Sequence, residues 1–192
     1  MIAYKGFKRD LTCTFGKGIF QYIPGQTIHE DRSKCTTAGL HCAEYPLECF
    51  KWYPPGRGSR YFEVEAAGSI DECQEDTRIA CTQLTLIREL TVLQLTARAM
   101  MYIVKHPSRQ WELSCENLMT ARDRAWARTE HDVAIARGRC PLVKGVPGSV
   151  LGLLCEEDEG RITDAKVVKV QKNIKPGVWY TLKNRELQEA EG

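Results

Sequence analysis

The chain has 192 residues, of which 43% are hydrophobic and 27% charged, and its formal net charge is +2. This length suits one domain or a domain with an appendage, and the composition is that of a globular protein. A charge so near balance gives no electrostatic footprint for nucleic acid or for an anionic membrane, so neither is an expected partner.

The N-terminus, MIAYKGFKRD, lacks the apolar core of a secretory signal. No apolar run reaches the roughly 18 residues of a membrane-spanning helix. We therefore expect a soluble protein of the cytoplasm. The nine cysteines are expected there to be reduced and mostly buried thiols rather than a disulfide framework.

The first third of the sequence predicts strands with one short helix among them. MIAYKGF predicts a strand, and GIFQYIPGQTIHE predicts a second strand, a turn at Pro24 and an extended arm. EYPLECFKWYPP predicts a short helix with Leu47 and Phe50 on one stripe, with Pro46 in its first turn and Pro54 at its end.

A longer strand is predicted at RYFEVEAAG, and another at RIACTQLTLI. In the first of these, Phe62, Val64 and Ala66 point to one face, while Glu63 and Glu65 point to the other. The short helix is expected to pack on the sheet that this strand forms with the first strand of the chain.

A helix is predicted from Glu89 to Lys105, because apolar residues recur there at helical spacing without an intervening proline. The expected organisation is an α+β domain at 1–88, this linking helix at 89–106, and a small, mostly β unit at 107–192.

A weak repeat follows the helix when the chain is written in steps of nine: RAWARTEHD, VAIARGRCP, LVKGVPGSV. The aligned columns are Ala125, Ala134 and Val143, and Ala127, Ala136 and Gly145. Small residues at such a step are typical of a short stack of β-solenoid coils. The alternative is a single amphipathic helix. For residues 110–145 the sequence does not decide between solenoid coils and a helix. Strands and a hairpin are predicted beyond them, at SVLGLLCE, ITDAKVVKV and VWYTLKN.

Zinc-ligand residue types gather in one stretch: Cys35, His41, Cys42 and Cys49. Their spacing lacks the paired C-x2-C of a zinc site, and the adjacent His41 and Cys42 would point to opposite faces of an extended segment. The same geometry argues against Cys42 as a nucleophile with His41 as its base. We therefore expect no metal.

The segments YKGF, GLHCAEYPLECFKWYPPG, RYFEVEAAGSI, RIACTQLTLIREL and EEDEGRITDAKVVKV resemble a family of uncharacterised small proteins of bacteriophages and prophages. Members have a similar N-terminal domain, a variable number of Ala/Gly-rich nonapeptide-like repeats and a similar C-terminal hairpin unit. In this chain bulkier residues, Trp126, Leu142 and Val143, stand in a shortened repeat section. The resemblance implies a phage setting and no reaction.

The order of YKG, GLHCA, a helix and a strand ending EVEAAG is similar to that in ADP-ribosyltransferases of the poly-ADP-ribose polymerase type. This resemblance implies a mixed sheet with short helices. It also implies that Lys5, Gly6, Gly39 and His41 line a groove for a nicotinamide nucleotide. There the two glycines would let a ligand approach the backbone closely, Lys5 would meet phosphate, and His41 would contact a ring.

The resemblance also requires a glutamate that stabilises the developing charge on the ribose, and ACTQLTLI has Gln83 in its place. Glu63 and Glu65 are candidate substitutes in the groove, because alternate residues of a strand share one face at a spacing of about 7 Å. The other interpretation of this pair is a solvated face.

Two hypotheses from different classes follow. The first is a non-enzymatic, phage-encoded accessory protein that binds a host protein or a small nucleotide in the host cytoplasm, with a role against host defence. The alternative is a NAD-dependent ADP-ribosyltransferase. Because the catalytic glutamate is not found, we expect no catalytic residue and no cofactor, and NAD only under the alternative.

Overall fold

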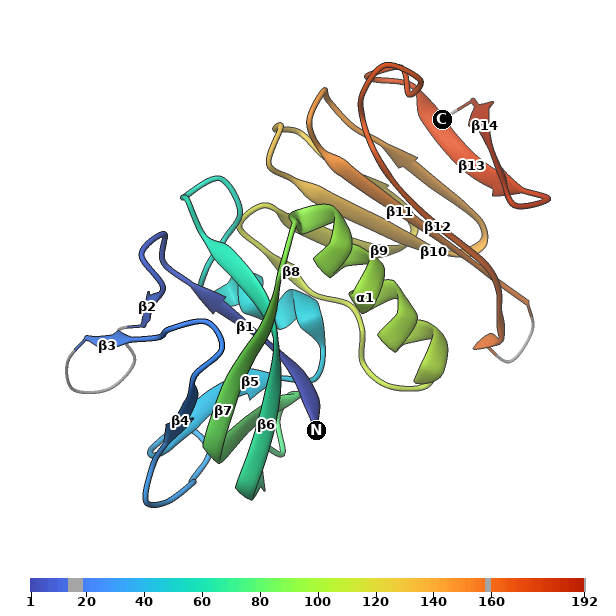
Figure 1. Cartoon of the computed structure of the whole chain (residues 1–192). Coiled ribbons are helices and arrows are strands. Elements are labelled where there is room, and N and C mark those ends of the chain that lie inside the picture. Colours follow the sequence, from blue (N-terminus) through green and yellow to red (C-terminus); the bar gives the residue numbers. More distant parts are fainter. Residues whose placement is uncertain (14–18, 158–159, 192) are drawn as a thin grey trace. The chain divides into compact units, whose positions relative to one another are not determined.

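The computed structural model describes residues 1–13, 19–157 and 160–191. It divides into two compact units, Met1–Thr91 and Val92–Gly192 (Figure 1). Strands dominate both units and helices are few, which confirms the α+β class in its coarse form. Within the described ranges, no helix is long and apolar enough to cross a membrane.

The first unit is built around one antiparallel sheet. Its elements are β1 (Ile2–Phe7), β2 (Thr12–Cys13), β3 (Phe20–Gln21), β4 (Thr27–His29), β5 (Leu40–Ala43), the 3-10 helix η1 (Pro46–Lys51), β6 (Arg60–Glu72) and β7 (Arg78–Leu90). The sheet has the order β4-β7-β5-β1-β6. Because β7 also pairs with β6, the pairings among β1, β5, β7 and β6 close into a ring.

The alternation in β6 separates a buried face from an exposed face, as predicted. Phe62, Val64 and Ala66 are buried, whereas Glu63 is half-buried and Glu65 exposed. The short helix forms as a 3-10 helix with proline in its first turn. Phe50 is 1% exposed, and its ring lies 5.1 Å from that of Tyr61 on β6. The expected packing of this helix on the sheet is confirmed.

The second unit begins with the long helix. Its elements are α1 (Val92–Lys105), β8 (Ser114–Cys115), β9 (Leu118–Trp126), β10 (Val133–Lys144), β11 (Val150–Glu156), β12 (Ile162–Lys169), β13 (Trp179–Lys183) and β14 (Glu186–Ala190). The helix starts three residues later than predicted, because Leu90 and Glu89 remain paired with β6 at the end of β7. It packs on β11 and β12 and so belongs to this unit, rather than forming a separate linker.

Residues 110–145 form strands, and the helix alternative for them is wrong. β10 pairs in parallel with both β9 and β11, so that Val133 lies opposite Leu118 and Val150. Further along, Val143 lies opposite Ala125, eighteen residues earlier. Ala134, the middle member of their predicted column, lies opposite Met119 and Leu151 instead. These parallel pairings are those expected for successive solenoid-like coils. β11 and β12, at SVLGLLCE and ITDAKVVKV, pair in antiparallel fashion as the predicted hairpin. β13 pairs in the same way with β14, where no strand was predicted.

The repeat columns supply the core of the coils. Buried members of one cluster include Ala125, Ala127, Ala134, Ala136 and Val143. These small side chains pack in the cluster beside larger ones, among them Leu151 and Leu153.

Candidate ligand pocket

A pocket of about 420 Å³ lies in the first unit. It is walled by β1, β5 and η1, by the rings of Phe20 and Tyr22, and by Trp52 directly after η1. All four candidates from the first strand and the GLH segment, Lys5, Gly6, Gly39 and His41, line it. They therefore share one concave face, as expected.

Lys5 places a cation in this pocket. Its Nζ donates a hydrogen bond to the carbonyl oxygen of His41 at 2.5 Å and lies 5.3 Å from the ring centroid of Tyr22 and 5.6 Å from that of Phe7. Burial opposes the charge, but the influence of Tyr22 and nearby thiols outweighs it, so the pKa of Lys5 is raised above its ordinary value. None of the partners recorded for its ammonium among the described residues is a carboxylate.

His41 is held in one orientation by the preceding loop. Its Nε2 accepts a hydrogen bond from the backbone N–H of Thr36 at 3.1 Å, so the neutral ring carries its proton on Nδ1. Burial, and then the nearby charge of Lys5, lowers the pKa of His41. The imidazole is consequently neutral at pH 7 and contributes no second positive charge to the pocket.

Neighbouring protein atoms account for both glycines without a ligand. A Cβ on Gly6 would lie 2.7 Å from Cδ2 of Tyr53. Gly39 has φ +90°, and a Cβ there would lie 3.0 Å from the carbonyl oxygens of Arg32 and Cys81. Glycine is thus required at both positions by neighbouring protein atoms and, at Gly39, by the left-handed backbone.

Glu63 and Glu65 are not among the residues that line the pocket. Glu63 forms an ion pair with Arg88 at 3.3 Å, and Glu65 is exposed on the outer face of β6. Gln83, which occupies the expected place of the catalytic glutamate, lies opposite His29 in the β4–β7 pairing and does not line the pocket either.

Sequence reasoning missed two carboxylates of the pocket, Glu30 and Glu48. Glu48 is buried in η1, where it accepts a hydrogen bond from Oγ1 of Thr77 at 2.9 Å and pairs with Lys51 at 3.3 Å. Glu30 is exposed, and its backbone N–H donates to the carbonyl of Thr82 on β7. No local sequence pattern predicts that either residue lines the pocket, because they come near β1 only when the sheet closes.

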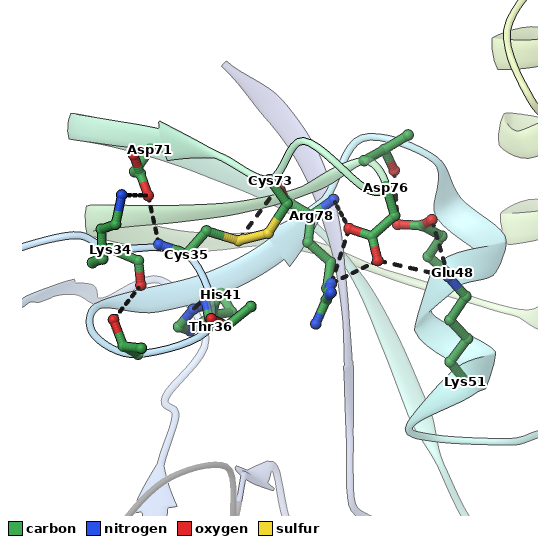
Figure 2. Close-up of a disulfide and its surroundings, with 12 residues drawn as sticks. Lys34, Cys35, Thr36, His41, Glu48, Lys51, Asp71, Cys73, Asp76 and Arg78 are labelled. Atoms are coloured by element: carbon green, nitrogen blue, oxygen red, sulfur yellow. Dashed lines mark hydrogen bonds and ion pairs between the residues drawn. A yellow bond between two sulfur atoms is a disulfide. The ribbon is translucent and has the colours of Figure 1, made fainter.

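A disulfide between Cys35 and Cys73 fastens one rim of the pocket (Figure 2). The expectation that all cysteines are reduced was therefore wrong for this pair, whose Cα atoms lie 5.7 Å apart. Cys35 lies in the loop between β4 and β5, next to Thr36, and Cys73 follows the end of β6. The other seven cysteines are not disulfide-bonded, and five of them are buried.

The zinc interpretation has no support in the structure. Cys35 is bonded to Cys73 and so cannot join His41 as a ligand. Across residues 1–13, 19–157 and 160–191, no group of three or more His, Cys, Asp or Glu side chains could hold a metal ion.

A family model described as a domain of unknown function, DUF7666, matches residues 1–98. The chain belongs to this family. The DUF7666 match covers the whole first unit, so the pocket lies inside the family domain. No curated protein and no solved structure matches the chain. The DUF7666 match agrees with the expected uncharacterised family and carries no statement about a phage origin or an ADP-ribosyltransferase fold.

Proposed function

We propose that the DUF7666 domain of this protein binds a nucleotide in the pocket beside Lys5 and catalyses no reaction on it. The observation that carries this proposal is the ammonium of Lys5, which lies among aromatic rings and has no carboxylate among its recorded partners. A partly buried cation without a counter-ion favours an anionic ligand, because the ligand supplies the missing charge.

The remaining walls suit the other parts of a nucleotide. Trp52 and Phe20 are 47% and 39% exposed, so each presents ring surface on which a base can stack. Arg78 also lines the pocket and lies over the ring of Trp52, 5.8 Å from its centroid, with its guanidinium paired to Asp76 at 2.8 Å. A volume of about 420 Å³ lies within the usual range of small-molecule sites, roughly 300–1,000 Å³.

The resemblance to phage and prophage proteins adds a setting to this proposal. In that setting the chain is a phage-encoded accessory protein, acting in the cytoplasm of the bacterial host by binding a nucleotide or a host protein. A role against host defence belongs to the same proposal and rests on the resemblance alone.

Calorimetric titration with NAD, ADP-ribose and cyclic nucleotides tests the nucleotide proposal. At least one of these is expected to bind the wild-type protein, and Lys5→Met, which keeps the apolar stem, is expected to weaken that binding at least tenfold. Lys169→Met changes an exposed lysine of the second unit and is expected to leave binding unchanged. No heat with any ligand, or equal affinity in wild type and Lys5→Met, contradicts the proposal.

A second candidate is the NAD-dependent ADP-ribosyltransferase, and Glu30 is the observation that favours it. Gln83 lies opposite His29, and Glu30 follows His29 directly and lines the pocket. A carboxylate directly after the end of β4 could therefore replace the missing glutamate. If so, labelled NAD transfers label to proteins of a bacterial lysate, and Glu30→Gln lowers the transfer at least a hundredfold. No transfer by the wild-type protein removes this candidate.

A further inference from the structure

We propose that the second unit carries a binding site for single-stranded nucleic acid, on the sheet face formed by Trp126, Lys144 and Trp179 with the flanking Arg124 and Arg128. We refer to these five residues as the Arg–Trp face. The site is separate from the pocket of the first unit and does not rest on the function proposed for it.

Three adjacent strands place two indoles and an ammonium in one row. Trp126 of β9 lies opposite Lys144 of β10. Val143 lies opposite Tyr180, which brings Lys144 beside Trp179 of β13. The Nζ of Lys144 is 4.5 Å from the ring centroid of Trp179. The row spans two strand spacings, about 10 Å.

The alternation of side chains directs this row outward. Each residue of the row has a buried neighbour on its own strand: Ala125, Val143 and Tyr180 lie in the core of the coils. Because successive side chains of a strand point to opposite faces, the residues of the row point away from that core. Trp126 and Trp179 are accordingly only partly buried.

Two exposed arginines flank the row. The guanidinium of Arg124 lies 5.8 Å from the ring centroid of Trp179, and that of Arg128 lies 5.1 Å from the ring centroid of Trp126. With Lys144 they bring three positive charges to a face that also presents two indoles.

Another pair of cations in the same unit, in contrast, is neutralised by a carboxylate. Arg122 and Arg137 also stack on a tryptophan, Trp111, but both form ion pairs with Glu156. Arg137 is 1% exposed and bonds to two carbonyl oxygens as well, so its charge is used inside the fold.

No such carboxylate is recorded for the side chains of the Arg–Trp face. Among the described residues, the only recorded side-chain partners of Arg124, Arg128 and Lys144 are the indole rings. Their N–H groups are therefore available to phosphates. The net charge of +2 describes the molecule as a whole and does not describe this face.

The alternation of indole and cation favours single-stranded nucleic acid over an acidic peptide. Bases stack on aromatic side chains while phosphates meet lysine and arginine, and this combination is typical of proteins that bind single strands. An acidic peptide would use the charges and leave the two indoles without a role. A phosphate at Lys144 would lie between bases at Trp126 and Trp179.

Fluorescence anisotropy with labelled ten-residue oligothymidylate and oligouridylate tests the site in the full chain. We expect salt-dependent binding of at least one of them, and the comparison of the two shows whether the sugar is read. Trp179→Leu is expected to weaken binding at least fivefold, as loss of one stacked base does. Lys144→Gln is expected to reduce the slope of log affinity against log salt by about 1.

Two controls separate this site from folding and from general charge. Arg124→Gln changes an exposed side chain and should weaken binding without lowering the melting temperature, whereas Lys172→Gln, exposed and outside the Arg–Trp face, should change neither. The proposal is overturned if neither oligonucleotide binds at low salt, if the Trp179 and Arg124 variants bind as wild type does, or if polyglutamate of equal charge competes equally well.

Discussion

The carboxylate of Asp71 accepts a hydrogen bond from the backbone N–H of Cys35 at 2.6 Å, beside the disulfide that joins Cys35 to Cys73 (Figure 2). This backbone hydrogen bond is the main reason that the pKa of Asp71 is lowered. Lys34 also pairs with Asp71, at 3.6 Å. The loop that orients His41 through Thr36 is therefore fastened to β6 by one covalent and two polar links.

Loss of the disulfide should lower the stability of the first unit. The bond closes a loop with a sequence separation of 38, and for such a loop the constraint on the unfolded chain contributes about 2–4 kcal/mol. We expect Cys35→Ser with Cys73→Ser to lower the free energy of unfolding by this amount in urea. Cys140→Ser, which changes an exposed free cysteine, should have no effect. Equal urea midpoints with and without reductant would argue against the bond.

Stability should depend on pH through His41. Its pKa is lowered in the folded state, by burial first and then by Lys5, so the unfolded chain binds a proton at higher pH than the folded protein does. The contribution of His41 is then complete above its unfolded pKa of about 6.5 and is lost as the pH falls toward the folded pKa. His41→Asn should flatten the dependence of the urea midpoint on pH between about 5 and 7. Substitution of the exposed His131 by Asn is the control, and identical slopes in wild type and His41→Asn would disprove the assignment.

Truncation of Phe50 should be costly. Its ring is 1% exposed and packs against Tyr61, and large-to-small changes of such a residue cost about 3–5 kcal/mol. Phe50→Ala is expected to lower the free energy of unfolding by that amount. Ile87→Ala, at a side chain that is 49% exposed, should cost far less. A thermal melt unchanged by Phe50→Ala would contradict the packing of η1 on the sheet.

The local sequence pattern was sufficient to predict those elements whose periodicity lies within one continuous segment. The two-residue period of β6 gave the buried face of Phe62 and Val64. The nine-residue step placed Ala125 and Val143 in one column and they do lie opposite each other, but Ala134 of that column lies opposite other residues, so each coil is longer than nine residues. The start of α1 was misplaced because the pairing of Leu90 with Tyr61 is set by β6, a strand distant from it in the sequence.

The candidate site was predicted only in part, for the same reason. Lys5 and His41 were found through a resemblance in the order of motifs, and they meet because β1 and β5 pair. Tyr22 reaches the pocket from a segment that has no motif. The bond between Cys35 and Cys73 forms because the β4–β5 loop meets the end of β6. The spacing of cysteines in the sequence does not predict that contact.

Gly145 offers a direct test of the stacked coils. A Cβ at this position would lie 2.4 Å from Oγ of Ser149, 3.0 Å from Cδ2 of Leu151 and 3.2 Å from Cβ of Ala127, its counterpart eighteen residues earlier. Because Leu151 and Ala127 are packed in the core, Gly145→Ala is expected to cost about 1–3 kcal/mol, as overpacking does.

The nearest obstacle, Oγ of Ser149, can be removed separately. It donates a hydrogen bond to the carbonyl of Val146 at 2.7 Å, so Ser149→Ala alone should also destabilise, by about 1 kcal/mol. In the double variant the methyl group added by Gly145→Ala no longer meets this oxygen, and the combined loss should be smaller than the sum of the two single losses. Urea unfolding of the four proteins measures the difference. Strict additivity would mean that the backbone of Gly145 does not approach Ser149 as it does in this structure, and the packing of the coil would have to be revised there.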